Sequence, residues 1–254
     1  MDTAAMALLA SAGLMAGAVN AIAGGGTLFA FPALISVGLP PVVANASCAL
    51  AVWPGHAAAI PVSWKQISNA RQGLVRRSIV ALLGGLAGSG LLLMTGERAF
   101  AAVIPWLLLF ATLLFALGPQ LRRLMAARKL ADGPSAPDSL LMLGIEFVFA
   151  VYGGYFGAGL GVLLMAGLTL AGHGDFHETA GMKNYLASLT TSIAVIVFIV
   201  SGTIAWPQTL CVLVGAIAGG MIGTTVSRRI SPNLLRAAVV LVGSILTVHY
   251  FGLF

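Results

Sequence analysis

The sequence predicts an all-α integral membrane protein built from two inverted-topology repeats, each with a broken or re-entrant half-helix. Its 254 residues are 59% hydrophobic and only 8% charged, with a mean hydropathy of +1.01, whereas soluble domains carry roughly 25% charged residues. Asp, Glu, Lys and Arg are absent from four long runs, 3–64, 78–96, 99–121 and 184–227. Each run can hold at least one helical span of about 20 residues, the length that crosses a bilayer.

The apolar segments predict about eight full spans and two short ones. The short ones, 27–38 and 160–171, would be about 18 Å long as helices, so neither crosses the bilayer upright. We divide the chain into a first repeat (1–118), a cytoplasmic linker (119–138) and a second repeat (139–254). The ten segments are 3–23, 27–38, 42–62, 78–95, 99–117, 139–156, 160–171, 184–202, 209–226 and 234–251.

Composition and termini also exclude several classes of protein. The first segment is expected to be a retained span, because no basic region precedes it and it exceeds the length of a signal-peptide core. The net charge of +6 comes from loop residues that determine topology, so nucleic-acid binding is not expected. Cys48 and Cys211 lie far apart in apolar runs and predict neither a metal site nor a disulfide.

The loop charges predict an orientation with both termini on the outer face. Only Arg98, beside Glu97, then faces outward among the thirteen Lys and Arg residues. The uncharged loop 202–208 is also outside in this arrangement. The basic groups expected in the cytoplasm are Lys65, Arg71, Arg76 and Arg77, then Arg122, Arg123, Arg128 and Lys129, then Lys183, and then Arg228, Arg229 and Arg236.

Two sequence patterns occur once in each half. Gly-Gly-Leu-Ala-Gly at 84–88 is echoed by Gly-Ala-Ile-Ala-Gly at 215–219, and a glycine cluster precedes each short segment. The loop before 84–88 is basic and expected inside, whereas the loop before 215–219 is uncharged and expected outside. Repeats of opposite orientation are typical of secondary transporters.

The glycine clusters are the first candidate binding elements. They comprise Gly24, Gly25 and Gly26, with Thr27 beginning the next segment, and Gly157 and Gly159 in the second half. An unwound backbone in a membrane needs partners from protein, water or ligand, and a half-helix can aim its N–H groups at an anion. Close helix packing is the alternative role, and it is the expected one for the G-x-x-x-G pairs 13/17, 84/88 and 215/219.

Polar residues follow each short segment, namely Asn45 and Ser47 in the first half and Lys183 and Asn184 in the second. An amide within a membrane segment is costly unless it is paired, which favours a binding role for both asparagines. Lys183 supplies a cation for an anion, or it is simply a loop charge near a helix start. Together these groups suit a small oxyanion.

Three ionisable residues, His56, Glu146 and His249, fall within apolar segments. Such residues indicate functional sites by default. His56 is expected to contact substrate or a coupling proton, or to bridge helices. Glu146 is expected either to accept a coupling proton or to pair with a polar group near the membrane edge. His249, beside Tyr250, is expected at the interface.

The chain resembles the TauE/SafE family of sulfite and organosulfonate exporters over nearly its whole length. The resemblance rests on 20–27, Phe31-Pro32, Gly38-Leu39-Pro40 and 44–47 in the first half, and on 152–159, Lys183-Asn184, Ser201-Gly202 and Trp206-Pro207 in the second. It implies export of a small sulfur oxyanion or sulfonate across the inner membrane, driven by ion gradients.

A passive anion channel and an intramembrane hydrolase are the alternatives. The hydrolase would use Ser89 with a buried histidine, but no nucleophile motif surrounds that serine. No nucleotide-binding loop is present in the sequence. We therefore expect a transporter rather than an enzyme, with no catalytic residues, cofactor or metal. Its expected partners are the anion and membrane lipid, and a homodimer stays open.

Overall fold

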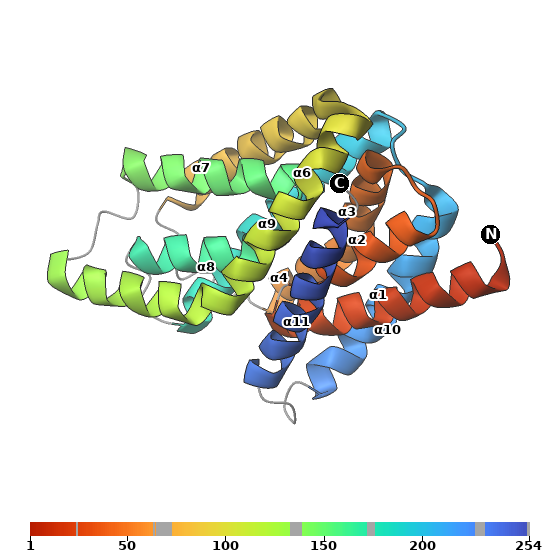
Figure 1. Cartoon of the computed structure of the whole chain (residues 1–254). Helices are drawn as coiled ribbons and strands as arrows, with labels where there is room; N and C mark the ends of the chain where they lie inside the picture. Colours follow the sequence, from red (N-terminus) through yellow and green to blue (C-terminus); the bar gives the residue numbers. More distant parts are fainter. Residues whose placement is uncertain are drawn as a thin grey trace.

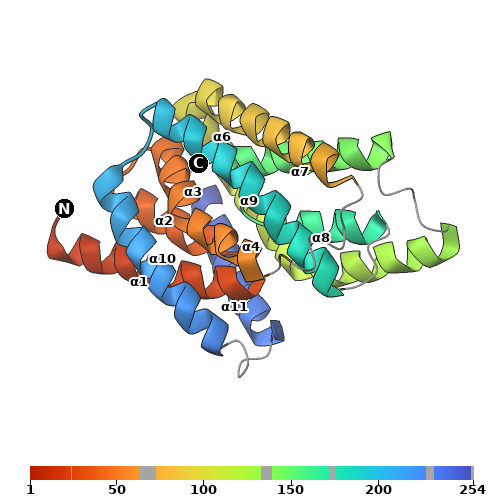
Figure 2. The same ribbon diagram turned by 180° about the vertical axis from the view of Figure 1, so that it is seen from behind.

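The computed structural model describes residues 1–23, 25–62, 64, 73–132, 139–171, 176–226 and 232–252. The elements within these ranges are all helices (Figures 1 and 2). They are α1 (Thr3–Ala23), α2 (Thr27–Ser36), α3 (Pro41–Ala57), α4 (Ala59–Val62), α6 (Leu74–Asp132), α7 (Leu140–Tyr155), α8 (Leu160–Leu170), α9 (Phe176–Val200), α10 (Trp206–Val226) and α11 (Pro232–Phe251).

The longest element, α6, consists of two arms that meet at Gly96. This residue has φ 72° and ψ 164°, outside the helical region, and glycine adopts such a positive φ without a steric penalty. The gold and yellow arms in Figure 1 meet there at a sharp angle. At the bend the Glu97 Oε2 atom accepts a hydrogen bond from the Val42 N–H at 2.8 Å, so a carboxylate caps the start of α3.

Two helices extend beyond the apolar segments of the sequence. The segment 119–138, expected to be a linker, is helical as far as Asp132, and residues 133–138 lie outside the described ranges. The Leu, Arg, Met, Ala and Lys residues after Pro119 favour helix strongly enough to extend α6. Similarly, α9 begins at Phe176 rather than near residue 184, so Lys183 and Asn184 lie inside a helix.

Four described helices are long and apolar enough to span a membrane. Their apolar stretches are Thr3–Asn20, Leu74–Leu121, Glu178–Val200 and Trp206–Gly223. The second stretch includes the bend at Gly96, so it covers both arms of α6. Other apolar helices, including α2, α7 and α8, are shorter. The eight full spans expected from hydropathy therefore stay a prediction, while the multi-pass helical architecture is clear.

Helices α1 and α10 pack at backbone distance along much of their length. A Cβ added to Gly215 would clash with the carbonyl oxygen of Ala10, and one added to Gly219 would clash with that of Leu14. Gly17 likewise meets the carbonyl oxygen of Ala216. Small residues four apart let two backbones approach this closely in a membrane.

The first arm of α6 packs against α7 in the same manner. A Cβ on Gly84 would lie 2.9 Å from the carbonyl oxygen of Phe147, and one on Gly88 would clash with that of Val151. The packing role predicted for the G-x-x-x-G pairs is confirmed by these contacts and by those between α1 and α10.

An aromatic cluster lies where α2, α6 and the end of α7 meet. The ring of Phe31 packs edge-on against Phe156 at 5.6 Å and against Phe100 at 6.4 Å. Phe100 in turn packs against Tyr155 at 5.6 Å. Such pairs stabilise by about 0.5–1.5 kcal/mol each beyond area burial. The cluster fixes the chain reversal between α7 and α8 against the first half.

Candidate functional site

The break between α7 and α8 is built by two glycines in the left-handed region. Gly157 has φ +81° and Gly159, which caps α8, has φ +83°. The Tyr152 hydroxyl donates to the Ala158 carbonyl at 2.5 Å and holds the turn in place. The helix is therefore interrupted where the glycine pattern predicted.

This break leaves backbone groups without partners on both sides. Among the described residues, the N–H groups of Gly159 and Gly161 have no hydrogen-bond acceptor, and the carbonyls of Gly153 and Gly154 have no donor. The two N–H groups belong to the start of α8, and the two carbonyls belong to the end of α7. The end of α7 thus presents acceptors and the start of α8 presents donors.

A second break separates α1, which ends at Ala23, from α2, which begins at Thr27. Gly24 lies outside the described residues. A Cβ on Gly26 would come within 2.5 Å of the Ala16 carbonyl oxygen, and one on Gly25 within 3.0 Å of the Phe115 ring. Gly25 and Gly26 therefore permit close packing, and neither lines the cavity described next.

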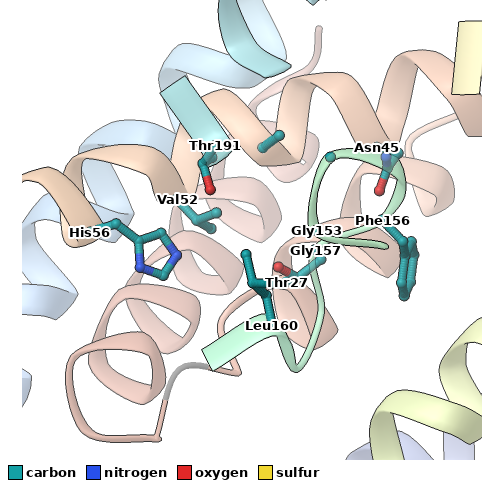
Figure 3. Close-up of a pocket in the computed structure, with 11 residues that line it drawn as sticks. Thr27, Asn45, Val52, His56, Gly153, Phe156, Gly157, Leu160 and Thr191 are labelled. Carbon is teal, nitrogen blue, oxygen red and sulfur yellow. The ribbon is translucent and has the colours of Figure 1, made fainter. Parts of the chain in front are cut away.

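A small cavity lies between the two breaks, with a volume of about 20 Å³, room for about one water molecule. In Figure 3 His56 and Asn45 approach it from opposite ends of α3. Both halves of the chain contribute to its wall. The lining residues are Thr27, Asn45, Ala49, Val52, His56, Gly153, Gly154, Phe156, Gly157, Leu160 and Thr191.

Asn45 joins the two halves at this cavity. Its Nδ2 atom donates to the Tyr155 carbonyl oxygen at 3.0 Å. The residue is only 3% exposed, and its Oδ1 atom is buried with no hydrogen-bond partner. A buried acceptor left unpaired costs about 1–3 kcal/mol. A hydrogen-bond donor or a cation bound in the cavity would remove this cost.

Ser47, the other polar residue of this element, lies away from the cavity. Its Oγ accepts from the Ala205 N–H at 3.0 Å, and the side chain is fully buried. This contact holds the loop before α10 and leaves Ser47 out of the cavity wall. Sequence alone could not indicate it, because the partners are 158 residues apart.

Lys183 lies beside the start of α8. Its Nζ atom is 3.9 Å from the position that a Cβ on Gly161 would occupy, and it is near enough to His56 for the two side chains to interact electrostatically. Asn184 is half-buried and is not part of the cavity wall. The ammonium group and the unpaired N–H of Gly161 thus share one small region.

Thr27 and Thr191 complete the polar wall. Thr27 lines the cavity from the start of α2. Thr191, which the sequence analysis did not single out, donates its hydroxyl hydrogen to the Ala187 carbonyl at 2.8 Å. It lies two helical turns after Asn184, and this helical spacing from a polar candidate was the available signal.

Glu146 lies elsewhere, in a buried ion pair. Its Oε1 atom is 3.0 Å from Arg77 NH1, with the side chains 6% and 0% exposed. The pair links α7 to the first arm of α6. The sequence placed Arg77 in a cytoplasmic loop, whereas the structure places it inside the first turn of α6.

The profile of the family described as "Sulfite exporter TauE/SafE" matches residues 9–250. The chain belongs to the TauE/SafE family. It is 28% identical to a "Probable membrane transporter protein" of Haemophilus influenzae, over 95% of this chain and 92% of that one. No solved structure matches the chain significantly.

Two further relatives have similar names. A "Probable membrane transporter protein ORF9" of Sinorhizobium is 26% identical over 96% of this chain and 91% of its own. "Probable membrane transporter protein YfcA" of Escherichia coli K12 is 28% identical over 92% and 85%. Its TauE/SafE membership and the names of these relatives indicate that the chain is a multi-pass membrane transporter.

Proposed function

We propose that this protein is a secondary active transporter that exports a small sulfur-containing anion, sulfite or an organosulfonate, across the inner membrane. The observation that supports this best is the position of Lys183 beside the first turn of α8, where the Gly161 N–H has no partner among the described residues. Anion binding is favoured where a cation, a free N–H group and the positive end of a helix lie close together.

We propose that the two halves, 1–118 and 139–254, are inverted repeats. In both glycine-packed helix pairs, a helix of one half contacts a helix of the other in the same register. The first glycine of the motif meets a carbonyl, and the second meets the carbonyl four residues later. The matching contacts are Gly84 with Phe147 and Gly88 with Val151, and Gly215 with Ala10 and Gly219 with Leu14. Exchanging the halves turns one pair into the other.

The size of the cavity supports a transporter over a passive channel. A volume of about 20 Å³ admits one water molecule but no sulfur oxyanion. Passage of the anion therefore requires the two halves to move relative to each other, as alternating access does. The position of Ser89 argues against the hydrolase alternative. This candidate nucleophile is fully buried and donates its hydroxyl hydrogen to the Gly85 carbonyl at 2.8 Å.

The remaining assignments within this proposal follow from sequence and position. We place both termini on the outer face, and we assign anion contact to Lys183, Gly157, Gly159 and Asn184. His56 is proposed to contact the anion or a coupling proton. Glu146 stays a predicted proton site, although its ion pair with Arg77 favours a structural role.

The test is transport by purified protein in proteoliposomes, together with thermal unfolding in detergent. Selective binding raises the unfolding temperature by mass action, and the panel is sulfite, sulfate, thiosulfate, sulfoacetate and taurine. We expect one sulfur anion to stabilise the protein and to be carried with saturating kinetics that respond to an ion gradient. No selective stabilisation and a flux that rises linearly with concentration would contradict the proposal.

A further inference from the structure

The geometry points to a binding site for a small monovalent cation, Na⁺, at the end of the cavity formed by Asn45 and the last turn of α7. The cation would bind beside the proposed position of the anion. The argument for cation binding does not depend on the proposed function. Only the use of this cation as a coupling ion rests on the proposed function.

The first observation is the orientation of Asn45. Because Nδ2 donates to the Tyr155 carbonyl, the amide is held in one orientation and Oδ1 is the atom left unpaired. The side chain lines the cavity and is 3% exposed. An acceptor in this position would repel a bare oxyanion, so its natural partner is a cation or a hydrogen-bond donor.

The second observation is the end of α7. The carbonyls of Gly153 and Gly154 have no donor among the described residues, and both residues line the cavity beside Asn45. A helix C-terminus carries about half a negative charge. Half-helix ends and unwound carbonyls supply the oxygen ligands of Na⁺ in membrane transporters.

Hydroxyl groups add further oxygen ligands. Thr191 has given its hydrogen to the Ala187 carbonyl, so only lone pairs of its oxygen stay available. Thr27 reaches the same cavity from the start of α2 (Figure 3). The wall therefore offers amide, carbonyl and hydroxyl oxygens from both halves of the chain.

Size and charge select the ion. About 20 Å³ suits one dehydrated ion or one water molecule. The lining residues include no Asp or Glu, and dipoles alone compensate one charge better than two. The neighbouring Lys183 ammonium group also repels a divalent ion more strongly than a monovalent one. These conditions favour a monovalent ion over Mg²⁺ and Ca²⁺, and helix-end carbonyls of this kind hold Na⁺ in membrane transporters.

The experiment is thermal unfolding of the purified protein in choline chloride with Na⁺, Li⁺ or K⁺ substituted at constant ionic strength, without any sulfur anion. With Na⁺ about tenfold above its Kd, we expect the unfolding temperature to rise by about 3–6 °C relative to choline. Asn45→Leu should lose this increment. Ser47→Ala, whose hydroxyl lies outside the cavity, should keep it despite a lower starting temperature.

A second variant covers the case in which Asn45→Leu does not fold. Asn45→Asp loses the bond to the Tyr155 carbonyl but retains an acceptor of nearly the same shape and adds a negative charge, so the apparent Kd for Na⁺ should fall at least about tenfold. Equal unfolding temperatures in Na⁺ and choline, or an Asn45→Asp variant with unchanged Na⁺ affinity, would overturn the proposal and leave water as the occupant. Neither result would touch the proposed anion transport, which the sulfur anion panel tests separately.

Discussion

The Asn45 side chain donates to the main-chain carbonyl of Tyr155 across 3.0 Å, and this bond connects α3 of the first half to the last residue of α7 in the second. The bond fixes the distance between the halves at the cavity. It also satisfies a carbonyl at the end of α7 that the break would otherwise leave unpaired. The movement between the halves that the proposed alternating access requires would have to break this bond.

The glycine-packed helix pairs lead to the first prediction. Gly88→Ala and Gly219→Ala should each lower the free energy of unfolding by about 1–3 kcal/mol, because the added methyl group meets a backbone carbonyl that cannot yield. Chemical denaturation in detergent measures the loss.

Gly90→Ala is the matched control on the same arm of α6, since a Cβ there meets nothing within 4 Å. It should be neutral or stabilising by up to about 1 kcal/mol, because alanine favours helix more than glycine does. A similar loss in all three variants would contradict the packing interpretation.

Much of this architecture is encoded locally. Gly157 and Gly159 predict a break because they precede an apolar segment too short to span, and the structure interrupts the helix there. Asn45 and His56 were candidates because of their polarity within apolar runs, and Thr27 because it follows the first glycine cluster. All three line one cavity. A polar residue in a membrane segment has few inexpensive positions, which makes this kind of inference effective.

Pairing between distant residues could not be predicted from sequence. Ser47 shares the polarity of Asn45 but bonds to Ala205 instead of facing the cavity. Arg77 seemed to be a loop charge, yet it is buried against Glu146. In both cases the partner comes from the other half of the chain, and only the three-dimensional packing of the halves selects it.

The Arg77–Glu146 ion pair gives the second prediction. Removing one partner leaves a buried charge, so Arg77→Met or Glu146→Leu alone should destabilise the protein by about 3–5 kcal/mol. The double variant should recover most of that loss, because an apolar pair of similar volume is tolerated there. A double-mutant cycle by denaturation measures the coupling.

Transport by the same double variant separates the two roles of Glu146. If the residue only stabilises the fold, the folded double variant should transport with the same response to a pH gradient as the unmodified protein. Loss of that response in a stable double variant would instead identify Glu146 as the proton site.

The third prediction compares two glycines with the same backbone strain. Gly159 has φ +83° and Gly38 has φ +87°, so alanine at either position should cost about 1–2 kcal/mol of stability. Only Gly159 caps α8. Gly159→Ala should therefore weaken the stabilisation by sulfur anions, whereas Gly38→Ala should leave it intact once stability is matched. Equal effects on anion binding would show that the break acts through stability alone.

The fourth prediction concerns Lys183, the cation beside the start of α8. A hydrogen bond to a charged group contributes about 1.5–3 kcal/mol, so Lys183→Met should weaken anion binding by about 10- to 150-fold. Lys183→Arg keeps the positive charge but changes the shape of the charged group. We expect this variant to keep more than half of the binding energy that Lys183→Met loses. Titration of the stabilising anion by thermal unfolding measures each Kd.

Arg98→Met removes the same charge from an exposed residue beside the α6 bend. Because salt screens exposed charges over about 10 Å, this control should bind the anion as the unmodified protein does. If Arg98→Met and Lys183→Met weakened binding equally, the effect would come from net charge rather than from contact at α8. A large difference between them at high salt would locate the anion at the first turn of that helix.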